Sequence, residues 1–146
     1  TALKLPQTYE FLSNCFNFLR FFICKFKKFL FAEQTFISDF CFQALNYSNC
    51  DQSDVRNQAA ALLFLLMKEY FIFDSSHFHQ MTVFITTAIS KLVGRGLKTD
   101  YFLRTSLSNI AEYARLDKTS SEFTDSVKKL IDRLFTVLRD NMQIFK

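Results

Sequence analysis

The amino-acid sequence predicts an all-α fold built from six helices. Apolar residues recur every three or four positions, and this helical spacing accounts for nearly all of them. The chain of 146 residues has only two glycines and one proline, the residues on which hairpin turns and phosphate-binding loops depend. With 49% hydrophobic and 22% charged residues, the composition fits one compact domain spanning residues 1–146.

The first predicted helix begins near Pro6, a residue favoured in a first helical turn, and extends to Leu30. The side of this helix opposite its apolar face is basic. A second helix is expected from about Glu33 to Tyr47, followed by a polar loop over residues 46–53. The predicted apolar faces are Leu12, Cys15, Phe16, Leu19, Phe22, Ile23, Phe26 and Leu30 in the first helix, and Ile37, Phe40, Cys41, Ala44 and Leu45 in the second.

The third helix is expected to follow Asp51 or Ser53 as its N-cap. It contains the run AAALLFLLM at positions 59–67, which is apolar on almost all sides and therefore predicts a central position. The fourth helix has the clearest single stripe and is predicted to end at Gly94. That stripe consists of Met81, Phe84, Ile85, Ala88, Ile89 and Leu92.

The last two helices complete the pattern. The fifth is predicted to begin around Thr99, and the sixth opens with Thr119 and Glu122 at the spacing of a capping box. Their predicted buried faces are Leu103, Leu107, Ile110 and Ala114 in the fifth, and Val127, Leu130, Ile131, Leu134, Leu138 and Met142 in the sixth.

The spacing of the helices predicts how they are arranged. Six helices with short loops form either a bundle or a stack of three antiparallel pairs. Helix starts near residues 7, 53 and 99 recur at about 46 residues, close to the period of armadillo and HEAT repeats. We therefore predict an armadillo/HEAT-like helical stack of antiparallel pairs.

Several features indicate a fragment of a longer chain. The sequence starts at Thr1, and its last helix has no stop signal before Lys146. Phe18, Phe21 and Phe29 lie outside the main apolar face of the first helix. Terminal repeats of a self-contained stack need polar outer faces, so these phenylalanines are expected to meet further helices.

The net charge of +4 arises entirely in residues 1–31. Basic residues interleaved with phenylalanine suit an anionic membrane surface, so the candidate lipid-contact residues are Arg20, Lys25, Lys27 and Lys28. The competing interpretation, which the pattern favours, is a buried helix whose lysines extend to solvent. Nucleic acid is not an expected partner, because one helix with four charges makes a small electrostatic footprint.

A catalytic site is not expected. Nucleophilic catalysis needs a base, and the histidines are His77 and His79 alone. Side chains two positions apart at a helix start diverge by about 200°, so these two are not expected to chelate one metal ion. The carboxylates that could act in acid-base chemistry fit helix caps and solvated charges better; they are Asp51, Asp54, Glu69, Asp74, Glu112 and Asp117. With no nucleotide-binding or hydrolase motif, we predict no enzyme activity and no cofactor.

The cysteines and the longest uncharged stretch indicate the cellular location of the chain. Cys15, Cys24, Cys41 and Cys50 form no CxxC pair, so a zinc site is unsupported. Their apolar neighbours predict reduced, buried thiols. No stretch resembles a signal peptide, and residues 57–67 are too few to cross a bilayer. We therefore expect a cytoplasmic chain that does not span a membrane.

Four segments resemble the Dock family of guanine-nucleotide exchange factors for Rho-type GTPases, in the helical region just before the exchange (DOCKER) domain. They are DVRNQAAALLFLLMKEYF (54–71), MTVFITTAISKLVG (81–94), YFLRTSLSNIAEYA (101–114) and FTDSVKKLIDRLFTVLRDNMQ (123–143). They match the family in order and spacing, and the similarity is greatest to the branch that acts on Rac and Cdc42. Residues 54–146 carry the resemblance, and residues 1–53 fit only by their helical pattern.

The resemblance implies a scaffold rather than a catalyst. The exchange site of such a protein is expected beyond Lys146, and its lipid-binding domain before Thr1. The segment itself is expected to pack against neighbouring domains of the same polypeptide, including the lobe that forms a homodimer, and to help position the exchange domain on its GTPase. The alternative, taken from the residues themselves, is an independent helical module that uses its basic first helix on a membrane or a partner protein, which would recruit it from the cytoplasm to the membrane.

Overall fold

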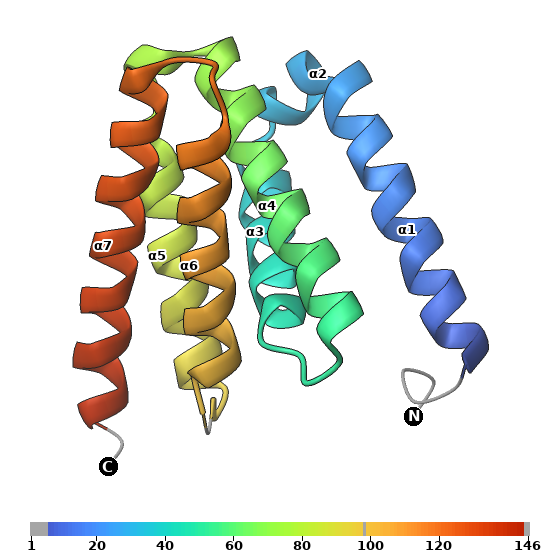
Figure 1. Ribbon diagram of the computed structural model, residues 1–146, viewed down its shortest axis with the longest axis vertical. Coiled ribbons are helices and arrows are strands. Elements are labelled where there is room, and N and C mark those ends of the chain that lie inside the picture. Colours follow the sequence, from blue (N-terminus) through green and yellow to red (C-terminus); the bar gives the residue numbers. More distant parts are fainter. Residues whose placement is uncertain (1–5, 98, 145–146) are drawn as a thin grey trace.

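A computed structural model describes the backbone of residues 6–97 and 99–144, and the side chains of residues 10–97 and 99–141. These residues form seven α-helices and one short 3₁₀ helix, without a strand, which confirms the all-α prediction (Figure 1). The elements are α1 (Pro6–Lys25), α2 (Lys27–Ala32), α3 (Gln34–Ser48), α4 (Ser53–Phe73), η2 (Ser75–His77), α5 (His79–Gly94), α6 (Tyr101–Leu116) and α7 (Ser121–Ile144).

The helices stack in two rows (Figure 1). In one row α4 packs between α1 and α6, and in the other α5 packs between α3 and α7. Contacts of α3 with α4 and of α6 with α7 join the rows. Helices within a row run in the same direction and helices of the other row run in the opposite direction. The chain therefore alternates between the rows as it adds helices.

The central position predicted for the helix containing AAALLFLLM is confirmed. This helix is α4, and it contacts α1, α3 and α6. Because neighbours cover it on several sides, it buries a large set of residues: Val55, Ala59, Ala60, Leu62, Leu63, Leu66, Met67, Tyr70 and Phe71. The buried residues of all seven helices form one continuous hydrophobic cluster.

The apolar faces predicted for the later helices are also confirmed. Every residue predicted on the faces of α3, α5 and α6 is buried. The same holds for α7 from Val127 to Leu138, whereas the side chain of Met142 lies outside the described residues. Helical periodicity is a reliable guide here because each helix is covered by neighbours on one stripe.

The prediction of one long first helix is wrong, because the helix breaks at Phe26. This residue has φ −119° and ψ 30°, and the chain continues as the separate helix α2. The bend turns Leu30 and Phe31 into the core, where the ring of Phe31 lies 5.1 Å from that of Tyr70 on α4. Phe26, expected on the apolar face, is consequently 51% exposed.

Two of the predicted N-caps are wrong. Gln52, rather than Asp51 or Ser53, occupies the N-cap of α4, without a side-chain cap hydrogen bond. At the start of α7 the hydroxyl of Ser120, not Thr119, accepts a hydrogen bond from the Phe123 backbone N–H at 3.0 Å. The predicted end of α5 at Gly94 is confirmed, and Gly96, two residues later, adopts the positive φ of 91° that reverses the chain.

The N-terminus of α6 is capped by a residue distant in sequence. The helix begins at Tyr101, two residues after the predicted start, and Asp100 at its N-cap provides no side-chain cap. Instead the amide of Asn49, just beyond α3, accepts a hydrogen bond from Leu103 N–H at 2.9 Å and donates one to the Thr99 carbonyl at 3.1 Å. This side chain ties the two rows together.

Candidate interaction surface on the first two helices

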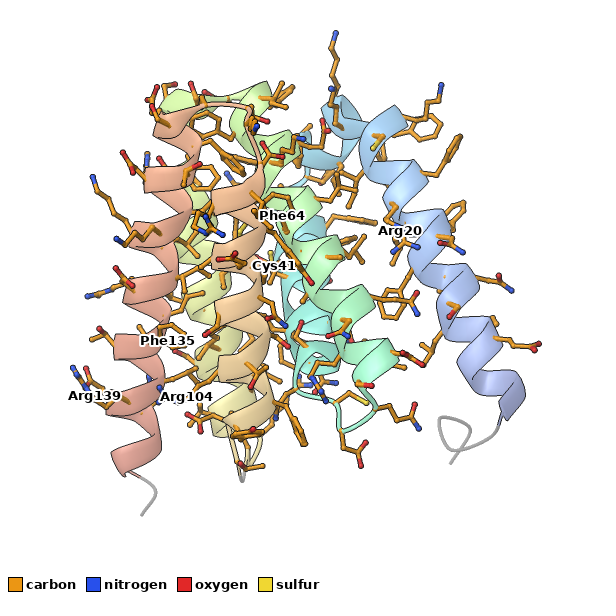
Figure 2. All side chains as sticks on the ribbon, in the orientation of Figure 1. Arg20, Cys41, Phe64, Arg104, Phe135 and Arg139 are labelled. Atoms are coloured by element: carbon orange, nitrogen blue, oxygen red, sulfur yellow. The ribbon has the colours of Figure 1, made fainter. Side chains whose placement is uncertain are left out.

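The four candidate basic residues do not form one patch. After the break at Phe26, Lys27 lies toward α4, where its ammonium donates to the carboxylate of Glu69 at 3.2 Å. Arg20, labelled on α1 in Figure 2, is half-buried. It donates a hydrogen bond to the side chain of Asn17 in its own helix. Lys25 and Lys28 remain exposed. Of the four candidates, Lys25 and Lys28 are therefore the most accessible to an external anion, and contact with lipid stays a prediction.

Exposed phenylalanines occur in the same helices as these lysines. The prediction that Phe18, Phe21 and Phe29 lie outside the apolar face is confirmed, since they are 62%, 56% and 64% exposed. The ammonium of Lys25 lies 6.0 Å from the centre of the Phe21 ring, a cation–π contact. The complete set of exposed phenylalanines on α1, α2, α3 and the bend between α1 and α2 is Phe11, Phe18, Phe21, Phe26, Phe29 and Phe36. The first helices thus expose several large apolar side chains, which makes this end of the fold the candidate interaction surface.

A groove opens between α1 and α3 beside this surface. Its volume is about 430 Å³, and Leu62 of α4 forms part of its floor. Asp39 is the charged residue in its lining, which is otherwise mainly apolar. The walls come from Phe11, Leu12, Cys15, Phe16 and Leu19 on α1 and from Phe36, Asp39, Phe40, Gln43, Ala44 and Tyr47 on α3. Such a surface binds apolar groups and offers little for polar chemistry.

The two histidines lie on the surface at the start of α5. His77 Nδ1 lies 2.7 Å from Asp74 Oδ2, and the rings of His77 and His79 have their centres 6.1 Å apart. Both side chains are exposed. Within the described part of the chain, no group of three or more His, Cys, Asp or Glu residues is placed to hold a metal ion.

The prediction of four buried cysteines holds only for Cys41. All four are free thiols, but Cys24 is exposed, and Cys15 and Cys50 are partly buried. Complete burial raises the pKa of the Cys41 thiol to about 12. Cys24 escapes burial because it lies on a side of α1 that faces neither α4 nor the groove. Among the described helices, none has the length and apolarity needed to cross a membrane.

Acid is expected to weaken the fold through carboxylates whose pKa is lowered in the folded chain, among them Asp74 and Asp117. Hydrogen bonds from Ser76 and His77 hold the pKa of Asp74 below its ordinary value of 3.8. Partial burial alone would raise the pKa of Asp117, but hydrogen bonds from Thr119 and Lys68 outweigh burial and lower it. A group whose pKa is lower in the folded chain stabilises the fold above its unfolded pKa and loses that effect as the pH falls through the folded value.

The urea midpoint should therefore be steady near pH 6 and fall below about pH 4. Urea titrations monitored by circular dichroism would measure this. Asp117→Asn should flatten part of the acid limb, because its ion pair with Lys68, 2.9 Å long, joins α4 to the end of α6. If the urea midpoint of the variant fell at acid pH just as in the unmodified chain, the stabilising role of the Asp117–Lys68 ion pair would be contradicted. Asp39→Asn, at an exposed position, serves as the control.

Comparison with known proteins identifies relatives along nearly the whole chain. It is 32% identical over 147 residues to dedicator of cytokinesis protein 7 of Mus musculus and 33% identical over 150 residues to dedicator of cytokinesis protein 8 of Homo sapiens. Each match takes in 98% of this chain but 7% of the relative. Dedicator of cytokinesis protein 9 of Rattus norvegicus is 30% identical over 149 residues. This match covers 97% of this chain and 20% of the relative.

No protein-family profile and no solved structure matches the chain. The similarity to the relatives extends beyond residues 54–146, because it takes in 98% of the chain. The chain spans only about 7% of the length of the first of them. On the strength of these matches, the chain belongs to the dedicator of cytokinesis (Dock) family.

Proposed function

We propose that the chain is a helical scaffold segment of a longer Dock-type exchange factor for Rho-family GTPases, and that the exchange site lies elsewhere in that polypeptide. The observation that carries this proposal is the similarity of 98% of the chain to about 7% of much longer Dock proteins. The exchange activity, the preference for Rac or Cdc42 and the homodimer are taken from the family resemblance. These three properties, and a cytoplasmic location, are parts of the proposal.

The two-row architecture supports a mechanical role. One continuous hydrophobic cluster runs through all seven helices, so a displacement at one end cannot be absorbed by a single loosely attached element. The contacts between the rows are both apolar and polar, as in the cap that Asn49 provides for α6. Such a body presents a rigid surface to neighbouring domains and keeps them at a constant separation.

A nucleotide-exchange assay tests the proposal. Residues 1–146 alone should not accelerate GDP release from Rac or Cdc42, whereas the full-length protein should. In the full-length protein, Leu63→Asp should lower the exchange rate at least tenfold, because Leu63 is 0% exposed at the centre of α4 and a buried carboxylate disrupts the stack.

The matched control is Lys129→Asp, which puts the same side chain on an exposed position of α7. It should leave the exchange rate unchanged. Exchange activity in residues 1–146 alone would overturn the assignment of the site to another part of the polypeptide. Full activity of Leu63→Asp would overturn the scaffold role.

A second candidate function is contact between the first two helices and an anionic membrane. It is favoured by the exposure of Lys25 and Lys28 next to Phe21, Phe26 and Phe29. Each lysine near an anionic surface contributes about 1 kcal/mol to binding, and salt screens this attraction. The contribution of Lys27 is reduced in this candidate, because its charge is paired with Glu69.

Sedimentation with phosphatidylserine vesicles measures this contact. Lys25→Glu combined with Lys28→Glu should lower binding by about tenfold or more, and added salt should weaken binding of the unmodified chain. The control is Lys128→Glu combined with Lys129→Glu, an equal charge change at exposed positions of α7. If both pairs of substitutions have the same effect, binding depends on net charge alone and the candidate surface is wrong.

A further inference from the structure

Helix α1 has two separate apolar sides. Phe16 and Ile23 are 4% and 0% exposed on the side that packs toward α4. Phe11 and Phe18 project from the other side and are 65% and 62% exposed. Phe18 lies about 160° around the helix axis from Phe16. A helix that is apolar on both sides is typical of the interior of a layered protein, where neighbours cover each side.

The outer side of α1 is hollowed as well as apolar. Besides the groove of about 430 Å³ shared with α3, a second hollow of about 330 Å³ lies on α1 itself. Its lining is Phe11, Asn14, Cys15, Phe18 and Leu19. Together these hollows follow α1 over more than two turns, the shape needed for the side-chain ridge of another helix. Figure 2 shows side chains that project from α1 away from the rest of the stack.

The opposite end of the stack differs in character. The solvent-facing positions of α7 are occupied by charged residues, including Lys128, Lys129, Asp132, Arg133 and Asp140, all of them exposed. No phenylalanine of the described part of α7 is exposed to the same degree as those on α1. The solvent-facing side of α7 is therefore suited to contact with water, whereas the outer side of α1 is not.

We propose that an additional amphipathic helix of the same polypeptide, outside residues 1–146, packs on the outer side of α1 and fills the groove between α1 and α3. The inference rests on the proposed function, since it requires a longer polypeptide. The rows favour this occupant, because α4 covers one side of α1 as α6 covers one side of α4, and a helix on the outer side of α1 would continue the same arrangement.

The length of the relatives supplies the second argument. They match this chain along 98% of its length and extend far beyond it, since the chain covers only about 7% of them. A segment on the same polypeptide has a high effective concentration at the groove, so it outcompetes a free partner of equal intrinsic affinity. A small apolar ligand could occupy the groove, but it would leave Phe18 and the second hollow uncovered.

Thiol labelling of the full-length protein tests this packing. Asn14→Cys places a probe in the second hollow without removing a phenylalanine, because Asn14 is an exposed residue of its lining. Lys129→Cys on α7 is the control. With N-ethylmaleimide and peptide mass spectrometry, the Asn14→Cys thiol should react at least tenfold more slowly than the Lys129→Cys thiol. Adding Phe18→Asp should restore fast labelling of Asn14→Cys, since a carboxylate cannot be covered by an apolar helix.

Other occupants give different results. Protection that disappears on dilution would indicate a second copy of the protein, and protection that appears only with phosphatidylserine vesicles would indicate a membrane. Each of these two results would overturn the proposal. It would also be overturned if the two thiols were labelled equally fast, or if the protection of Asn14→Cys persisted after Phe18→Asp. Because labelling does not depend on nucleotide exchange, an accessible Asn14→Cys thiol would refute the docked helix and leave the exchange test of the scaffold role unaffected.

Discussion

Replacing Phe123 with alanine is expected to lower the free energy of unfolding by about 3–5 kcal/mol. Phe123 is 0% exposed, and its ring lies 5.2 Å from Phe71, 5.9 Å from Phe64 and 6.3 Å from Phe78, centre to centre. These rings come from α4, from α7 and from the residue between η2 and α5, so the cavity would weaken three parts of the fold at once. Urea denaturation followed by circular dichroism measures the change.

Two comparisons separate the cavity from a general loss of aromatic surface. Phe123→Leu keeps most of the apolar volume and should cost less than Phe123→Ala. Tyr101→Ala removes an aromatic side chain that is 67% exposed and should change stability by no more than about 0.5 kcal/mol. If Phe123→Ala were as mild as Tyr101→Ala, the aromatic cluster would not be the stabilising contact that its geometry indicates.

The second large effect is expected at Asn49, whose replacement by alanine should lower the free energy of unfolding by about 2 kcal/mol. The substitution removes the acceptor that caps Leu103 N–H and the donor to the Thr99 carbonyl. Both lost bonds lie at the junction of α3 and α6, so the start of α6 should fray. Thermal unfolding gives the stability, and hydrogen exchange at Leu103 reports the fraying.

Asn46 provides a matched control, because it is the same residue type one turn earlier in α3 and its side chain is exposed. Asn46→Ala should leave stability within about 0.5 kcal/mol of the unmodified chain. Asn49→Asp keeps the acceptor for Leu103 but cannot donate to Thr99, so it should be intermediate. Equal effects of Asn46→Ala and Asn49→Ala would show that the cap contributes nothing.

The candidate surface could be predicted from the sequence only in part. An excess of phenylalanine around α1 was visible in the pattern, because residues at 18, 21 and 29 do not fit the single face of one helix. The groove was not, since its walls belong to α1 and α3 and its floor to α4. The pairing of Lys27 with Glu69 could not be predicted either, because the two residues are 42 positions apart.

The sequence by itself determined the fold class, the buried faces of α3, α5, α6 and α7, the central position of α4 and the end of α5 at Gly94. These features depend on residues three or four positions apart, whose spacing decides which side of a helix is apolar. Tertiary structure alone decided the break at Phe26, the cap of α6 by Asn49 and the side of α1 that is left uncovered. Each of these depends on a neighbour distant in the chain, because the bend is favourable only when Leu30 and Phe31 have α4 to pack against.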